Sequence, residues 1–498
     1  MKLNHIFAII AIALLSASCQ DFLNLSDPNA VTTGNYYQNE TDMQNSLNGA
    51  YAVLKEGNFM GSSNPYFEEC KARMRTYPDT GVNAGENASF DNCTVVPSNQ
   101  FVLSRWNIIY KCIDRVNVLL KHLDDITYTN ASVRNNLEGE ARFIRALCYY
   151  TLVCDWGDVP VVLSKLESLA EVKAANFRKP KADVYQAIYD DCEWVISNSS
   201  LPDLQGKAGV GHASKVAAQT LYGKALLQKA TDADFASEKS SLCSKAISQL
   251  TAAWNKKPFG DFTTVDVTEI WDVANQAAAK ESIFQLDFVG GSNAANSSYN
   301  TSFRTSNIDD ASKEVNAKKS AGGFFMSVPK AESIWDEAGD KRFDILMGKG
   351  KTSGGLTGYY TVKYKDLDAS GYYGCNNVVL RYADVAMMLA EANYHNGNAT
   401  EAVKWVNLIR NRAGLANTTA TSGTALRDVI YKERQREFAY EFKAWTDLKR
   451  GYNASEITSI MKADGATEFD NADLLLPIPH AQWLLNPEGL YQNPGYKD

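Results

Sequence analysis

Three glutamates on one predicted helix are the strongest candidates for catalysis. Glu433, Glu437 and Glu441 recur every four residues within 427–449, so a helix places them on one face. Paired carboxylates catalyse glycoside hydrolysis when they face each other across the bound sugar. Carboxylates stacked along a single helix do not meet that requirement, and we predict structural ion pairs instead. The candidate cationic partners are Arg410, Arg412, Arg434, Arg436 and Arg450.

No other motif in the sequence supports catalysis, a metal site or a cofactor. The four histidines after residue 5 show no paired spacing, and neither H-E-x-x-H nor C-x-x-C occurs, so no metal site is predicted. A G-x-S-x-G nucleophile elbow is also absent. Gly350-Lys351-Thr352 resembles the end of a phosphate-binding loop, but Ile345 occupies the position of its first glycine. We therefore expect a protein that is not an enzyme.

Aromatic residues gather in two segments that lack a helical period. The first, 56–99, is rich in Gly, Asn, Ser and Pro, and the second, 259–377, is interrupted by glycine pairs. Short alternating patterns at 282–288 and 359–364 predict strands in the second segment. Long irregular segments in a compact protein are usually functional or disordered, and the aromatic residues favour ordered, functional loops.

Between these segments the chain reads as a helical scaffold. Apolar residues recur at helical spacing in eight further stretches, several of them joined in pairs by short polar turns. Such pairs predict an all-α fold of tetratricopeptide-like helix pairs, an α–α superhelix with long irregular aromatic-rich loops and minor short strands. The predicted helices are 39–54, 106–123, 133–155, 184–196, 214–229, 242–254, 378–396 and 400–413.

The N-terminus has the pattern of an export signal that ends in a lipidated cysteine. Lys2 precedes an apolar run, 6–15, which is too short to cross a bilayer and matches the core of a signal peptide. Small residues then lead to Cys19, which we predict to be lipidated after removal of 1–18. Ser16 stands where such signals usually have leucine. The alternative is an ordinary secretory peptide cut near residue 17 or 18, with Cys19 incidental.

Composition and spacing suggest how the remaining chain is divided. We predict a tether over 19–38, a helical scaffold over 39–260, a loop-rich insertion over 261–377 and a C-terminal region over 378–498. The net charge of −8 and the lack of basic runs argue against nucleic-acid binding. Cysteines at 112, 148, 154 and 192 fall in helical patterns, where a buried apolar role is expected. A disulfide between Cys70 and Cys93 stays open.

Several motifs, in order along the chain, resemble the SusD/RagB family. The similarity spans essentially the whole sequence, and such an ordered set is more specific than any one motif. The matching stretches are CQDFL at 19–23, EARFIRA at 140–146, WGDVP at 156–160, NVVLRYAD at 377–384, LAEA at 389–392, VNLIRNRAGL at 406–415, ERQREFAYE at 433–441, DLKR at 447–450, LPIP at 476–479 and QNPGY at 492–496.

The resemblance implies a lipoprotein of the bacterial outer membrane that is anchored through Cys19, faces the outside of the cell and has no catalytic role. It implies a binding protein that captures a glycan, or for some members a peptide, and delivers it to a TonB-dependent transporter. A glycan-degrading enzyme on a helical scaffold and a purely structural transporter lid are the alternatives. The family motifs belong to the scaffold and identify no ligand contacts.

Ligand contacts must therefore come from the chemistry of the side chains. A sugar ring offers an apolar face ringed by hydroxyl groups, so its site needs aromatic platforms beside amide, carboxylate or guanidinium groups. Both aromatic-rich segments contain this mixture. The predicted ligand-binding residues are Tyr66, Tyr77, Asp79, Asn83, Phe90 and Asn92 in the first segment and Tyr299, Asn300, Phe303 and Arg304 in the second.

Overall fold

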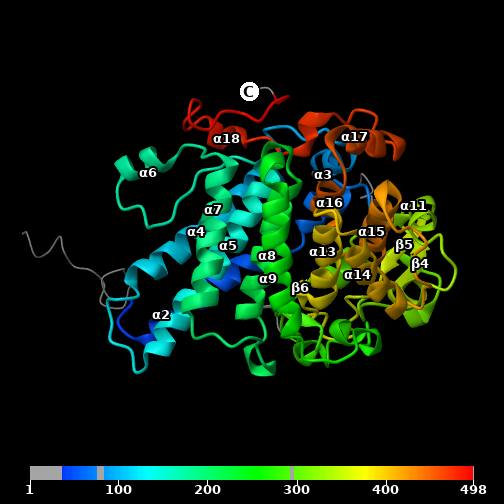
Figure 1. Ribbon diagram of the computed structural model, residues 1–498, viewed down its shortest axis with the longest axis horizontal. Helices are drawn as coiled ribbons and strands as arrows, with labels where there is room; N and C mark the ends of the chain where they lie inside the picture. Colours follow the sequence, from blue (N-terminus) through cyan, green and yellow to red (C-terminus); the bar gives the residue numbers. More distant parts are fainter. Residues whose placement is uncertain (1–35, 76–83, 292–295, 497–498) are drawn as a thin grey trace, which may run out of the picture.

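The structure is a computed structural model that describes residues 36–75, 84–291 and 296–496 (Figure 1). Cys19 and the predicted signal peptide lie outside the described residues, as do Tyr77, Asp79 and Asn83. Helices dominate the architecture, and the strands are few and short. The all-α, tetratricopeptide-like prediction is confirmed.

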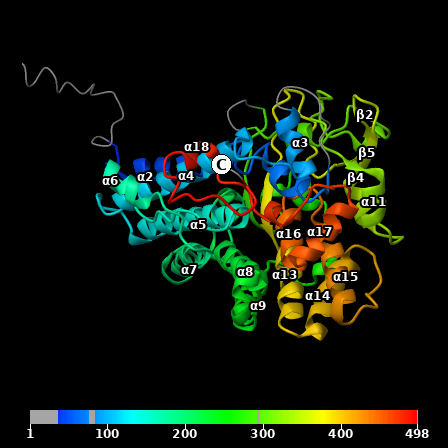
Figure 2. The same ribbon diagram turned by 90° about the horizontal axis from the view of Figure 1, so that it is seen from above.

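A row of packed helices forms the body of the molecule. In this row α4 contacts α5, which contacts α7, and the contacts continue in order through α8, α9, α13 and α14, while α2 packs on α4 and α5. Figure 2 shows the row curving from α4 and α5 to α14. The helices are α2 (Glu40–Leu54), α4 (Gln100–His122), α5 (Ala131–Trp156), α7 (Lys181–Asn198), α8 (Lys215–Thr231), α9 (Lys239–Asn255), α13 (Tyr382–His395) and α14 (Ala399–Arg412).

The helices follow from apolar spacing and from capping side chains. On α4, Trp106, Ile109 and Ile113 share the buried face, and the Asn99 side chain caps the first turn by accepting from two backbone N–H groups. Almost every residue of α5 from Leu137 onward is buried, because α2, α4, α7 and α8 all pack against this helix. It ends at Gly157, whose φ of 74° is a left-handed conformation that suits glycine.

The C-terminal segment closes the end of α5. The backbone N–H of Leu476 donates to the Asp155 carbonyl at 2.7 Å, and the indole Nε1 of Trp156 donates to the Pro477 carbonyl at 2.9 Å. Asn493 Nδ2 in turn donates to the Trp156 carbonyl at 3.0 Å. The last backbone carbonyls of a helix have no partners within it, and here the end of the chain supplies one for Trp156.

Two small sheets flank the helices. Strand β1 (Ser282–Leu286) pairs antiparallel with β6 (Asn377–Arg381). A four-stranded sheet of order β2-β4-β5-β3 lies at the right-hand end of Figure 1, beside α11 (Val328–Ile334). The predicted strands at 282–288 and 359–364 overlap β1 and β5. The bounds of the second sheet are β2 (Asn307–Ile308), β3 (Met326–Ser327), β4 (Met347–Lys351) and β5 (Thr357–Thr361).

Two stretches differ from the secondary structure predicted from the sequence. One contains helices where none was predicted, and the other begins with a strand in place of a helix. The irregular segment 56–99 includes a π-helix, η2 (Tyr66–Cys70), and a short helix, α3 (Ala84–Asn92). The helix predicted over 378–396 starts only at Tyr382, because its first residues form β6. Alternating Val378 and Leu380 are buried there, as in a strand.

The helix predicted over 427–449 is broken in two. Helix α15 (Gly423–Glu437) stops before α16 (Ala444–Gly451), and Tyr440 and Phe442 between them have φ values of 66° and 57°. Left-handed backbone is costly for such bulky residues, so other contacts must hold it. The backbone N–H of Phe442 donates to Glu69 Oε1 at 2.8 Å, and the Tyr440 hydroxyl donates to the Tyr359 carbonyl at 2.6 Å.

The cysteines and helix hydropathy fit the sequence expectations. Within the described ranges all eight cysteines are buried and unpaired, so Cys70 and Cys93 form no disulfide here. Among the helices that the structure describes, none combines the length and apolar character needed to cross a membrane.

Candidate functional site

The two aromatic-rich segments meet in space. The ring of Tyr66 lies 5.8 Å from Phe90 and 5.1 Å from Phe324, measured between centroids. Phe324 lies 6.1 Å from Phe303, which is 6.0 Å from Tyr299. These five residues, which we call the aromatic cluster, join parts of the chain more than two hundred positions apart.

The rings of the aromatic cluster face one another and not the solvent. None of the five is more than 7% exposed. Apolar ring surface is stabilised more by burial than by hydration, so a segment with this many rings builds its own small core. A ligand cannot touch Tyr66, Phe90, Tyr299 or Phe303 in this arrangement. Their role in ligand binding stays a prediction, and their visible role is to hold the surrounding backbone.

Hydrogen bonds fix Tyr299 and Arg304 in the interior. The Tyr299 hydroxyl donates to the Met60 carbonyl and accepts from Asn377 Nδ2 at 3.1 Å. Arg304 forms a bidentate ion pair with Glu314, with Nε–Oε1 and Nη2–Oε2 distances of 2.5 and 2.8 Å. The hydrogen bonds from this guanidinium hold the pKa of Glu314 below its ordinary value. Both side chains are therefore already engaged within the protein.

Two other buried polar groups beside the cluster lack hydrogen-bond partners. The guanidinium of Arg75 is fully buried, yet its three nitrogens make no hydrogen bond within the described part of the chain. It lies over the rings of Phe303 and Tyr440 at 4.6 and 4.7 Å, and its Nε is 3.6 Å from Glu69 Oε2. Both amide atoms of Asn300 are likewise without partners among the described residues. Buried polar groups are rarely left unpaired, and such exceptions call for an explanation.

The remaining predicted residue, Asn92, lies at the surface at the end of α3. The structure therefore brings Tyr66, Phe90, Tyr299 and Phe303 into one cluster, with Asn300 and Arg304 on the same stretch as Tyr299. Sequence reasoning missed Arg75. The available signal was an arginine inside an aromatic-rich segment, two positions before Tyr77.

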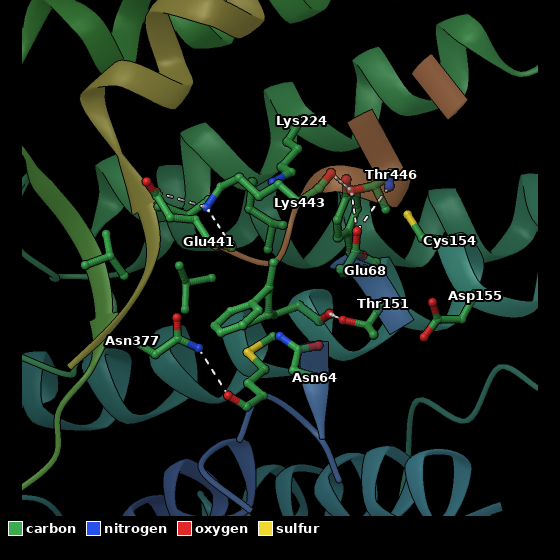
Figure 3. Close-up of a pocket in the computed structure, with 18 of the residues that line it drawn as sticks. Asn64, Glu68, Thr151, Cys154, Asp155, Lys224, Asn377, Glu441, Lys443 and Thr446 are labelled. Atoms are coloured by element: carbon green, nitrogen blue, oxygen red, sulfur yellow. Dashed lines mark hydrogen bonds and ion pairs between the residues drawn. The ribbon is translucent and has the colours of Figure 1, made fainter. Parts of the chain in front are cut away.

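A small interior cavity lies next to the break after Glu437 (Figure 3). Its volume is about 80 Å³, and η2, α5, α8 and β6 also line it. Glu68 accepts from the backbone N–H groups of Trp445 and Thr446, both at 3.1 Å. Lys443 Nζ lies 4.0 Å from Glu441 Oε2. A space of this size and polarity suits a few water molecules and not a sugar ring.

Burial shifts the protonation of the charged groups in this cavity. Burial and the nearby Asp155 carboxylate raise the pKa of Glu68 to about 7, although the Thr446 N–H opposes this. Burial also lowers the pKa of Lys443 to about 8. The cavity therefore concentrates costly charges at the junction between the helical row and the C-terminal region.

The three glutamates considered for catalysis form a buried ion-pair network. Arg342 bridges Glu433 and Glu437 at 2.6 and 2.9 Å, and Arg381 bridges Glu437 and Glu441, each at 2.8 Å. All three carboxylates are at most 2% exposed. The predicted structural role is confirmed. Further partners in the network are Glu281, Lys363, Arg410, Arg412 and Arg436.

The guanidinium groups keep these carboxylates ionised. Burial alone would raise the pKa of Glu437, but Arg412, Arg381 and Arg342 outweigh it and hold that pKa well below the ordinary value. For Glu441, burial is similarly outweighed by Arg381 and Lys363, which lower the pKa. A glycosidase acid requires the opposite, a raised pKa beside an open substrate cleft.

Two family models match different parts of the chain. The model described as the SusD family matches residues 348–496. The model described as starch-binding associating with outer membrane matches residues 21–227. The first region contains the three glutamates of the ion-pair network, and the second contains η2, α3 and the long helices α4 and α5.

Related proteins match over nearly the full length. SusD-like protein P2 of Formosa agariphila is 26% identical over 98% of both chains, and SusD-like protein P25 of the same organism is 24% identical over 100% of both. Among solved structures, a laminarin binding SusD-like protein has a TM-score of 0.72 at 23% identity, covering 92% of this chain and 100% of its own. Surface glycan-binding protein A from Bacteroides uniformis has a TM-score of 0.73 at 22% identity, with 91% and 99% covered. The two matched regions and these nearly full-length similarities confirm the resemblance to the SusD/RagB family.

Proposed function

We propose that this protein is a glycan-binding lipoprotein of the outer membrane that delivers its ligand to a TonB-dependent transporter and does not cleave it. The observation that carries the proposal is the match of residues 21–227 to a family described as starch-binding associating with outer membrane. The printed descriptions of two proteins of the same fold, one binding laminarin and one a surface glycan-binding protein, support the choice of a glycan.

The ligand region we propose is the surface over the aromatic cluster. Asn92 lies on this surface, and the predicted residues Tyr77, Asp79 and Asn83 of the same sequence segment are further proposed contacts. The buried predicted residues that support the surface from within are Tyr66, Phe90, Tyr299, Asn300, Phe303 and Arg304. The buried rings hold this surface in shape, while Asn92 offers an exposed amide. The amide of Asn300 and the guanidinium of Arg75 make no hydrogen bond with the described residues, which supports the assignment, because binding sites tolerate polar groups that a folded core does not.

Absence of catalysis is supported by the state of the acids. Glu433, Glu437 and Glu441 are buried and bound to arginines, so they cannot reach a substrate without dismantling the ion-pair network. A purified-protein glycan panel with product analysis tests the whole proposal. We expect retention of at least one glycan and no released sugar. Released sugars would contradict the binder, and silence across both glycans and peptides would favour a structural lid.

Site variants separate the proposed region from the rest of the surface. Tyr77→Ala and Asn92→Ala should each weaken binding of the retained glycan by about tenfold, the effect of losing one stacking or hydrogen-bonding contact. Tyr394→Ala, which removes a half-buried ring at the end of α13, is the matched control and should leave affinity unchanged. Equal affinity in all three variants would place the ligand elsewhere.

The anchor and the partner have their own tests. Cys19→Ala should move the protein from the membrane fraction to the soluble fraction and leave glycan affinity intact, because only the lipid is lost. Retention in the membrane would show that the anchor is misassigned.

Purification of the wild-type protein from detergent-solubilised outer membranes should recover a TonB-dependent transporter. Recovery of the protein alone would remove the delivery step from the proposal.

A further inference from the structure

We propose that the C-terminal end of the molecule carries a second binding site, which takes a short neutral oligosaccharide. The site is a cleft of about 730 Å³ between the ends of α5, α7 and α8, helices α16 and α17 (Ala454–Ala463), and the segments 470–475 and 493–495. In Figure 1 α17 and the C-terminal segment lie along the upper edge of the molecule. The volume falls within the range of about 300 to 1,000 Å³ of small-molecule sites. We call it the C-terminal cleft.

The lining of the C-terminal cleft combines apolar surface with open amides. Ile457, Leu474 and Leu475 contribute apolar walls. Asn453 and Asn471 stand exposed at the cleft, and each uses its side-chain oxygen to accept an internal hydrogen bond. Their Nδ2 groups make no hydrogen bond with the described residues and point to a ligand that offers acceptors. Hydroxyl groups and ring oxygens around an apolar sugar face provide that pattern.

Charge balance favours a neutral ligand. Lys181 Nζ is 2.6 Å from a carboxylate oxygen of Asp232 and 2.6 Å from one of Asp234. Lys449 Nζ donates to the Cys154 carbonyl at 2.5 Å and to the Leu474 carbonyl at 3.4 Å. Both cations of the cleft are therefore already neutralised or hydrogen-bonded within the protein. Among the described residues that line the cleft, neither lysine is left free to bind a phosphate, sulfate or carboxylate.

A second hollow continues the site beyond the wall formed by 493–495. It measures about 540 Å³ and is lined by the rings of Trp483, Tyr491 and Tyr496. Tyr491 is 46% exposed, and its ring is fixed by a 2.7 Å hydrogen bond from its hydroxyl to Asp158 Oδ2 and by the Arg178 guanidinium 4.3 Å from its centroid. A rigid, exposed aromatic ring is a platform for the apolar face of a sugar. The cleft and this hollow together fit an oligosaccharide that extends over the wall.

The C-terminal cleft is separate from the ligand region proposed above. The aromatic cluster is built from η2, α3, Phe324 and the 299–304 segment, and no residue of that cluster lines the cleft. The choice of a sugar rests on the proposed glycan-binding function. The existence of the cleft does not, so the two ideas can fail separately.

A blocking substitution tests the cleft. Ala233 lines it and is exposed, so Ala233→Trp fills the opening with little disturbance of the core. Ala236→Trp, in the same short 3₁₀ helix but outside the lining, is the matched control. The probe is a panel of short neutral gluco-, manno- and xylo-oligosaccharides, titrated calorimetrically into the purified protein. Melting curves confirm that each variant is folded.

We expect at least one oligosaccharide to bind Ala233→Trp about tenfold or more weakly than it binds the wild-type protein. Its affinity for Ala236→Trp should equal that for the wild-type protein. Tyr491→Ala should weaken the longer members of the series more than the shorter ones. Loss of all binding in Tyr77→Ala with none in Ala233→Trp would overturn the second site and leave the first intact. The sugar assignment would be overturned if the protein bound apolar peptides and no sugars, and if Ala233→Trp abolished that peptide binding. A panel that binds nowhere would overturn this proposal together with the glycan function.

Discussion

The aromatic cluster and the ion-pair network are both buried, but they are stabilised in opposite ways. Rings pack without strict direction, so the cluster tolerates side chains such as Arg75 and Asn300, which make no side-chain hydrogen bond with the described residues. In the network, Glu437 alone meets Arg342, Arg381 and Arg412. Each charge depends on specific neighbours, because an unpaired ion in the interior is costly. One region therefore has unused hydrogen-bonding capacity, and the other has little.

The largest expected effect is the loss of one cation from the network. Arg381→Ala removes the shared partner of Glu281, Glu437 and Glu441, all buried. We expect the free energy of unfolding to fall by about 4 to 5 kcal/mol, as for other buried pairs broken on one side. Urea denaturation of the soluble protein measures it. A loss of about 1 kcal/mol or less, typical of surface pairs, would mean that the network is not stabilising. Lys404→Ala, which breaks an exposed pair with Glu401, is the control.

The second effect depends on pH and concerns Glu68, which lines the interior cavity together with Glu441 of the ion-pair network. Glu68 has an ordinary pKa of 4.5 that rises to about 7 on folding, so the folded protein binds this proton more tightly than the unfolded chain. The resulting stabilisation is fully present below about pH 4.5 and is lost as the pH rises through about 7, amounting to about 3 kcal/mol at most.

Glu68→Gln isolates this contribution. Relative to the variant, the wild-type protein should lose stability across this pH interval, measured by urea denaturation at several pH values. Outside the interval the two stability curves should run parallel. Parallel curves throughout would mean that Glu68 ionises as easily in the folded protein as in the unfolded chain.

The smallest effect is expected in the aromatic cluster. Phe303→Leu keeps an apolar side chain at a fully buried position, so we expect a loss of about 1 to 2 kcal/mol from the smaller volume. The same urea experiment measures it. A loss as large as that of Arg381→Ala would erase the contrast between the two regions.

The spacing of apolar residues predicted the helical row well, because each helix forms from a pattern within its own stretch of sequence. Trp106, Ile109 and Ile113 recur at helical spacing. The observed α4 begins six residues before the start of the predicted helix 106–123 and ends one residue before its end. The break after Glu437 could not be predicted in this way. The left-handed Tyr440 and Phe442 are held by Tyr359 and Glu69, which lie far away in the sequence.

The candidate site shows the same limit. Composition located both segments of the aromatic cluster, but it could not tell which rings would face solvent. That outcome depends on Phe324 joining Tyr66 to Phe303 across the molecule. It also depends on Arg75, whose surroundings include Phe303 and Tyr440 from two other parts of the chain.

The closure of α5 by the C-terminal segment also sets an order of events in time. Asp155 and Trp156 receive partners from Leu476, Pro477 and Asn493, which follow them by more than three hundred positions. The end of α5 therefore stays incomplete until these later residues have been synthesised, although the sequence of the helix itself is finished far earlier.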